Sequence, residues 1–231
     1  MFKILFQIIL IIYIVFLFLN ILDLKKYNIN GFIINCKDKE DILLNIRNLN
    51  ISLINHKNIY DIQEVMFDKG ESIENIVINE RDFININKNK SLLKEINEDE
   101  IPNFFTESKI PMVNNSSISI YKNHTSDLQQ CYSNHTVLYI IDGMTKIYIF
   151  NPKHNDEIKG KGLNIIKKWG HIKELKKGDY LIIPTNWFYT LETKEHCIIY
   201  NNSVNNIFTI IPNFIRENYS SFKLPELKII S

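Results

Sequence analysis

The chain has few of the residues that cross-link, interrupt or loosen a fold. Its three cysteines, Cys36, Cys131 and Cys197, are an odd number without paired spacing, so the sequence predicts no disulfide framework. It contains no CxxC and no Cys/His spacing typical of structural zinc. Seven glycines and six prolines among 231 residues, with no long polar tract, argue against a largely disordered chain.

The chain also lacks an excess of positive or negative charge. The 27 basic and 26 acidic residues leave a net charge of +1. A protein that binds the phosphate backbone usually carries a strong positive field, and a net charge of +1 does not indicate one. The sequence therefore predicts no nucleic-acid partner.

The N-terminus carries a long apolar run. Ile4–Leu22 is uncharged and is polar only at Gln7 and Asn20. At about 1.5 Å per helical residue, its 19 residues just cross a hydrocarbon core of roughly 30 Å. A cleaved signal peptide is the competing interpretation, but Ala, Gly and Ser are missing near the end of the run.

We therefore expect residues 1–26 to be an uncleaved transmembrane anchor, with the lipid bilayer as the partner of residues 4–22. The protein would then be a single-pass membrane protein. Lys3 flanks one side of the run, and Lys25 and Lys26, together with Asp23, flank the other. Because cationic residues flank both sides, the side of the membrane that holds the domain stays undetermined.

After the anchor, about 205 residues are enough for one substantial domain. Residues 27–116 have the mixed pattern of an α/β lead-in that packs on the core. Predicted strands cover 27–35 and 51–54, predicted helices cover 38–48, 58–72 and 91–97, residues 81–86 suit either, and 101–112 is predicted as a loop.

Residues 117–231 are predicted to be the β-rich core and a C-terminal tail. Short β-branched and aromatic runs alternate with turns, a pattern typical of an antiparallel sandwich or barrel. Asp142-Gly143 predicts a hairpin turn, and Gly178-Asp179 predicts a second tight turn. Predicted strands cover 117–122, 136–141, 145–150, 171–175, 180–184, 187–192, 196–200 and 206–211, with a helical insert over 162–169.

Two segments resemble a known family. Leu128–Pro152 contains the Asp-Gly pair and ends in Phe-Asn-Pro, and Lys177–Thr193 contains Gly-Asp, a later Pro and the triplet Trp-Phe-Tyr. Together they are similar to the signature segments of cupin-like (JmjC-like) iron/2-oxoglutarate hydroxylases. The resemblance covers 117–212 well and 27–116 only loosely. It implies a mainly β fold, a double-stranded β-helix with helices packed outside it, beyond the N-terminal transmembrane helix.

The resemblance also shows where this chain departs from the family. The family begins its first segment with His-x-Asp and closes the second with His, and the corresponding positions here are Gln130, Tyr132 and Tyr189. The basic residue that holds the cosubstrate carboxylate corresponds to Thr145, and Lys146 is expected on the opposite face of its strand. Pocket and scaffold positions implied by the resemblance are Gly143, Gly178, Asp179, Pro184, Trp187 and Asn201.

These substitutions remove the donor atoms that iron(II) chemistry needs. A facial triad uses two imidazoles and a carboxylate, whereas an amide oxygen is a poor ligand and phenols with pKa values near 10 are neutral at pH 7. We expect no catalytic residue, metal or cofactor, and we expect Tyr132, Tyr189 and Trp187 to fill the former pocket. Each histidine that could replace a ligand is predicted to be a surface or loop residue: His124, His135, His154, His171 and His196.

The functional hypothesis is a membrane-anchored cupin/JmjC-like domain that is catalytically inactive and has a binding or structural role. Its partner would be an unknown protein or small molecule. The alternative is an active iron(II)/2-oxoglutarate-dependent hydroxylase or demethylase-like oxygenase with non-standard ligands. A third possibility is a secreted sandwich whose likeness to cupins is fortuitous.

Overall fold

The N-terminal third combines one long helix with a small α/β unit. The computed structural model describes residues 2–23, 27–28, 31–37, 39–55, 83–87, 112–218 and 228–229. The helices predicted over 58–72 and 91–97, and the predicted loop up to residue 111, lie outside these residues. Helix α1 covers Phe2–Asp23, and β1 (Tyr27–Asn28) pairs in parallel with β11 (Lys228–Ile229).

The small α/β unit forms where its sequence pattern predicts. Strand β2 (Ile33–Cys36) leads into α2 (Lys39–Arg47), which is followed by β3 (Ile51–Asn55). Acidic residues begin α2 and Arg47 ends it, as the helix dipole favours. Because α2 carries the chain from one end of β2 back to the start of β3, the two strands pair in parallel.

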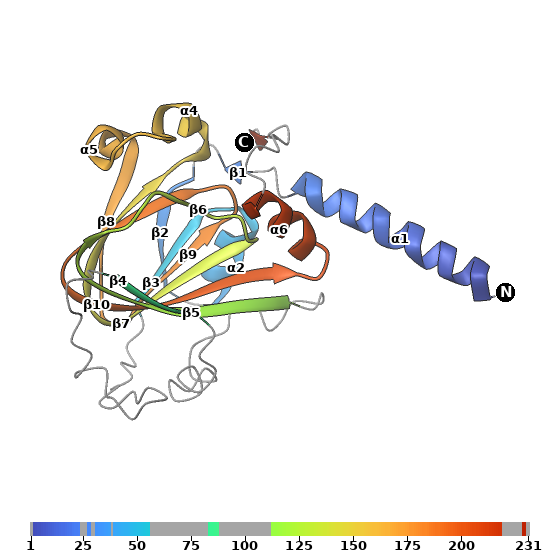
Figure 1. Cartoon of the computed structure of the whole chain (residues 1–231), viewed down its shortest axis with the longest axis horizontal. Coiled ribbons are helices and arrows are strands. Elements are labelled where there is room, and N and C mark those ends of the chain that lie inside the picture. The colour runs from blue at the N-terminus through green and yellow to red at the C-terminus, as the bar shows by residue number, and fades with distance from the viewer. Residues whose placement is uncertain are drawn as a thin grey trace, which may run out of the picture.

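The main sheet is mixed and strongly curved (Figure 1). Its hydrogen-bonded order is β2-β3-β9-β7-β10-β5-β4, with β6 paired to β10 and β8 paired to β7. The prediction of a mainly β protein is confirmed. The remaining strands are β4 (Phe83–Asn87), β5 (Met112–Thr125), β6 (Gln129–Gln130), β7 (His135–Phe150), β8 (Gly170–Lys176), β9 (Asp179–Pro184) and β10 (Phe188–Asn206).

The predicted hairpin at Asp142-Gly143 is wrong. Strand β7 continues through this pair, which forms an irregularity opposite Cys197 and Ile198 of β10. Gly143 has φ +77°, and a Cβ there would lie 2.1 Å from the His196 carbonyl oxygen, so no larger residue fits this bend. By contrast, Gly178-Asp179 does separate two strands, β8 and β9, as predicted.

The segment 206–211, predicted as a strand, is also different. Strand β10 ends at Asn206, and α6 begins at Ile210 and ends at Asn218. The Asn206 side chain accepts hydrogen bonds from the backbone amides of Phe208 and Thr209, at 2.9 Å each. This side-chain turn takes the chain out of the sheet, and α6 begins four residues later despite the β-branched residues of the segment.

Both faces of the central strands are buried. An inner cluster on one face includes Leu138, Ile140 and Trp187, and an outer cluster on the other includes Val137, Tyr139 and Ile42 of α2. A third cluster lies beneath the helical insert between β7 and β8. The insert consists of short helices over Pro152–His154, Asn155–Ile158 (α4), Leu163–Ile166 (α5) and Lys167–Trp169.

Helix α1 extends away from the sheet, and its C-terminal half lies beside α6 (Figure 1). Its rings contact the turn before α6, since Tyr13 and Phe16 lie 5.9 and 5.3 Å from the Phe208 ring centroid. Among the residues that the structure describes, no helix is long and apolar enough to cross a membrane, so the predicted transmembrane helix is not supported.

Candidate functional site

A pocket of about 680 Å³ opens between the sheet and α6. Strands β5, β6 and β10 supply its walls, and α6 supplies its rim. The three residues at the family's metal-ligand positions, Gln130, Tyr132 and Tyr189, all line it. The structure therefore brings together residues that are up to 59 positions apart in the sequence.

The lining is polar but almost without charge. Its amides come from three strands and one helix: Asn114, Asn115, Gln129, Gln130, Asn205 and Asn213. Its hydroxyl groups come from Tyr132, Ser133, Thr136, Tyr189 and Ser203. Among the described residues of the lining, Glu217 is the one charged side chain. Amides and hydroxyls both donate and accept hydrogen bonds, so this pocket suits a neutral polar ligand.

The strand register refines the predicted geometry. Tyr189 lies opposite Gln129, and Gln130 lies opposite Phe188. Opposed residues on antiparallel strands point to the same face, so Gln129 shares a face with Tyr189, and Gln130 shares one with Phe188. The motif positions included Gln130 and Tyr189 but not Gln129, although the alternation of side chains along a strand could have raised the question.

Tyr189 belongs to the interior of the sheet rather than to an open metal centre. It is 6% exposed and packs in the inner cluster with Cys131 and Tyr121. Burial, followed by the nearby Cys131 and Tyr121, raises the pKa of the Tyr189 hydroxyl well above 10. Burial likewise raises the pKa of the Cys131 thiol to about 12. Both groups are therefore neutral at physiological pH.

An asparagine network holds α6 against the pocket wall. Asn213 is 3% exposed, and its Nδ2 donates to Asn205 Oδ1 at 2.5 Å and to Asn134 Oδ1 at 3.4 Å. The Asn134 backbone amide donates to the same Asn205 oxygen at 3.3 Å. Asn213 Oδ1 is buried and has no hydrogen-bond partner among the described groups, and Asn213 lines the pocket.

The donor set does not fit iron(II) with 2-oxoglutarate. The described residues contain no group of three or more His, Cys, Asp or Glu side chains that could hold a metal ion. His124 stacks on Tyr121, His154 lies against Trp169, and His171 and His196 are exposed. The amide and the two phenols at positions 130, 132 and 189 offer no anionic oxygen at neutral pH.

His135 does not lie on the surface as predicted. It begins β7, and both of its ring nitrogens are buried although the residue as a whole is half-buried. This burial lowers the pKa of its imidazole to about 4, so it is neutral at pH 7. His135 follows Gln130 by five residues, and this spacing gives no sign of the burial because the chain bends at residues 133–134, between β6 and β7.

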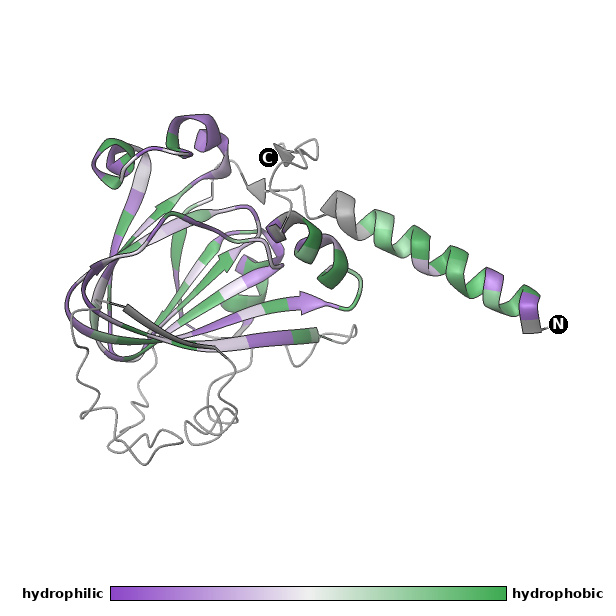
Figure 2. Cartoon of the chain, viewed as in Figure 1, coloured by the Kyte–Doolittle hydropathy of each residue, from purple (hydrophilic) through white to green (hydrophobic). Residues whose placement is uncertain are grey.

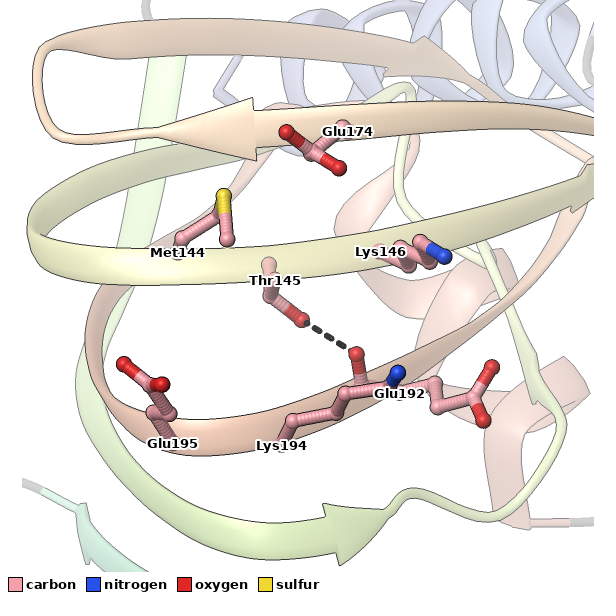
Figure 3. A pocket seen from close by; sticks show the side chains of 7 residues that line it. All are labelled: Met144, Thr145, Lys146, Glu174, Glu192, Lys194 and Glu195. Atoms are coloured by element: carbon pink, nitrogen blue, oxygen red, sulfur yellow. Dashed lines mark hydrogen bonds between the residues drawn. The ribbon is translucent and has the colours of Figure 1, made fainter.

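Thr145, at the former cosubstrate position, lies elsewhere. It lines a separate cavity of about 170 Å³ together with Glu192 and the exposed Lys146. Figure 3 shows its side chain pointing toward the Glu192 backbone, whose carbonyl accepts its hydrogen bond at 3.4 Å. Its hydroxyl also bonds that of Thr193 at 2.8 Å. The predicted metal and cosubstrate positions therefore do not share one pocket.

The remaining predicted positions serve the strands around the pocket. Asp179 accepts a hydrogen bond from the Lys176 amide at 3.0 Å beside Gly178, whose φ is +86°. Pro184 ends β9 and pairs with His135 of β7. Trp187 is fully buried in the inner cluster, and Asn201 donates to the Ser119 hydroxyl at 2.8 Å.

No protein-family profile and no curated protein sequence matches the chain. Among solved structures it is similar to a cupin superfamily protein from Desulfitobacterium hafniense, with 9% identity and a TM-score of 0.34 over 55% of this chain and 82% of that one. It is also similar to an RmlC-like cupin from Shewanella frigidimarina, with 13% identity and a TM-score of 0.30 over 41% of this chain and 68% of that one. Salicylate 1,2-dioxygenase from Pseudoaminobacter salicylatoxidans is similar with 10% identity and a TM-score of 0.30, over 46% of this chain and 22% of that one.

Proposed function

We propose that the chain is a cupin-like binding domain without oxygenase chemistry, and that its ligand is a neutral, polyhydroxylated molecule of the saccharide class. The signature segments around Asp142-Gly143 and Gly178-Asp179 support the cupin-like assignment, as does the curved sheet they help to form. We infer a binding role because the described lining offers hydrogen bonds in several directions and Glu217, on the α6 rim, is its one acidic or basic side chain.

The composition of the pocket lining is the observation that carries this proposal. Side-chain amides and hydroxyls surround a volume of about 680 Å³, and both phenolic and amide groups lie at the positions where the family holds iron. A neutral polyol can match such groups without the desolvation cost that an unpaired ion would have. Tyr132, half-buried at the pocket wall, adds an aromatic ring for the apolar face of a sugar.

We further propose that α1 attaches this domain to a lipid bilayer. Its side chains from Ile4 to Leu19 are apolar apart from Gln7, and most are exposed, including Phe6 at 63%. A continuous apolar helix surface of this kind is stabilised by contact with hydrocarbon and is costly in water. The proposed role is tethering, with the pocket held near the membrane.

Calorimetric titration of the full chain in detergent micelles tests the binding proposal. The probes are a panel of neutral mono- and oligosaccharides and, separately, iron(II) with 2-oxoglutarate. We expect a saturable signal from at least one saccharide and none from the iron mixture. Asn115→Ala at the pocket should weaken the signal, whereas Asn164→Ala, an exposed amide on α5, should not.

A stoichiometric iron(II) site, or 2-oxoglutarate turnover, would instead favour an oxygenase with non-standard ligands. Saccharide binding that Asn115→Ala and Asn164→Ala leave equally unchanged would place the ligand outside this pocket. No signal from any saccharide would reject the proposed ligand class.

A further inference from the structure

Helix α6 is amphipathic in the opposite sense to a helix that packs on a hydrophobic core. Most of its described outward side chains are aliphatic or aromatic, with Ile211 48% and Phe214 62% exposed, and Glu217 near its end is the charged exception. Its inward side chains include Asn213, and the turn before it buries Thr209. Exposed apolar residues of α6 and of the turn before it recur at spacings of three, four and seven positions. We call them the α6 stripe: Ile207, Ile210, Ile211, Phe214 and Ile215.

Hydrogen bonds, rather than burial of the stripe, hold α6 on the domain. Asn213 donates to the side chains of Asn205 and Asn134, and Thr209 Oγ1 accepts from the Asn206 amide at 3.0 Å. The polar face of α6 is therefore already used inside the protein. An exposed apolar face of this kind is typical of a surface that contacts lipid or another protein.

The stripe is continuous with the apolar surface of α1. Phe208, between Ile207 and the first turn of α6, lies 5.3 Å from Phe16 and 5.9 Å from Tyr13 of α1. Figure 2 shows hydrophobic residues along α1 and again on the neighbouring α6. Phe16 precedes the last residue of α1, Asp23, by seven positions, which is about 10 Å along a helix axis.

We infer that α6 is a second membrane contact, lying in the bilayer interface with its stripe toward the acyl chains. This inference rests on the proposed attachment of α1. If the charged residues after α1 mark the membrane surface, contact with Phe16 brings α6 to the depth of about 5–10 Å that interfacial helices reach. Ile210 and Phe214 also line the pocket rim. Two attachments would therefore fix the domain so that its pocket opens at the level of the lipid head groups.

Depth-dependent fluorescence quenching tests this inference on the full chain. The variants Ile211→Trp and Ile165→Trp place an additional indole on α6 and, as the matched control, on α5, where Ile165 is 59% exposed on the side of the sheet away from α1. Each is reconstituted into phosphatidylcholine vesicles with or without bromine on the acyl chains. Subtracting the parent signal corrects for Trp169 and Trp187.

We expect brominated lipid to remove most of the added emission in the Ile211→Trp protein and little of it in the Ile165→Trp protein. Equal quenching of both, or of neither, would overturn the inference. Flotation of the same vesicles separates the two proposals. A chain that does not float with vesicles rejects the attachment by α1, and with it the role of α6. A chain that floats but shows no quenching of the Ile211→Trp indole rejects α6 alone.

A second variant distinguishes lipid from another protein copy as the neighbour of the stripe. Ile211→Glu should reduce vesicle association at low protein-to-lipid ratio, while Ile165→Glu should not. If Ile211→Glu instead abolishes a concentration-dependent dimer that persists in detergent, the stripe belongs to an interface between copies, and the membrane role of α6 is wrong.

Discussion

Helices α2 and α6 are both nine residues long and rest on the same sheet, yet they present opposite faces to it. Helix α2 places Ile42 in the outer cluster, with Ile46 packed against it, and turns Glu40 and Arg47 to solvent. Helix α6 turns Asn213 inward and Phe214 outward. A helix on a sheet is thus not necessarily there to cover the core.

The opposite orientations of α2 and α6 indicate that the two helices contribute differently to the fold. At α2, apolar burial stabilises the fold in the ordinary way. At α6, the helix is fixed by amide hydrogen bonds and leaves its apolar side chains available. Substitutions at equivalent-looking aliphatic residues should therefore have unequal effects on folding, and this inequality is measurable.

The largest effect is expected in the inner cluster of the sheet that supports both helices. Trp187→Ala should lower the free energy of unfolding by about 3–5 kcal/mol, since it removes a fully buried indole. Its indole N–H has no hydrogen-bond partner among the described groups, so Trp187→Phe should cost less than its lost volume suggests. Urea unfolding followed by circular dichroism measures both. Equal losses for Phe and Ala would contradict this expectation.

The comparison of the two helices itself is tested at Ile42. Ile42→Ala should destabilise the domain by about 2–5 kcal/mol, because this side chain is 3% exposed in the outer cluster. The same unfolding measurement provides the value. A change close to zero would mean that α2 contributes little to the core and that the contrast with α6 is not one of burial.

Acidification should weaken the α6 side of the sheet through His135, which follows Asn134 of the α6 network. The folded pKa of His135 is about 4, below the unfolded value of about 6.5, so protons bind the unfolded chain first. Its stabilising contribution is complete above pH 6.5 and is lost as the pH falls to 4, by about 3 kcal/mol in total. The variant His135→Gln should show a smaller loss over this window. An identical pH profile would exclude His135 as the source.

The smallest effect is expected on the stripe. Ile211→Ala should change the unfolding free energy in detergent by less than about 0.5 kcal/mol, as for most exposed positions. If Ile211→Ala loses vesicle association but keeps its stability, the difference between α6 and α2 becomes clearer. If Ile211→Ala is destabilised as much as Ile42→Ala, the two helices do not differ in this respect.

Local sequence signals predicted one Gly-Asp turn correctly and misjudged the Asp-Gly pair. Gly178 sits where the chain reverses, and Asp179 accepts a backbone hydrogen bond three residues back. Gly143 has the same type of positive φ, but β10 passes beside it and its pairing continues on both sides. The presence of that distant strand cannot be read from the dipeptide.

The candidate site was predictable in composition but not in arrangement. The motif positions identified Gln130, Tyr132 and Tyr189, and all three line one pocket. The opposition of Gln129 to Tyr189 depends on strand register, and the contribution of α6 depends on the side-chain turn at Asn206. A β-branched run after β10 looked like another strand because that tertiary hydrogen bonding has no counterpart in residue periodicity.

The two bent strands also constrain the order of folding. Strand β7 pairs with β10 from Phe150 opposite Phe188 to His135 opposite Val204. The sequence separation of the paired residues is therefore about 38 positions at one end of this pairing and about 69 at the other. Closing such loops is entropically slow, so the domain should fold in milliseconds to seconds rather than microseconds. During synthesis, β7 must wait for β10 to leave the ribosome, and its two apolar faces would meanwhile be substrates for chaperones.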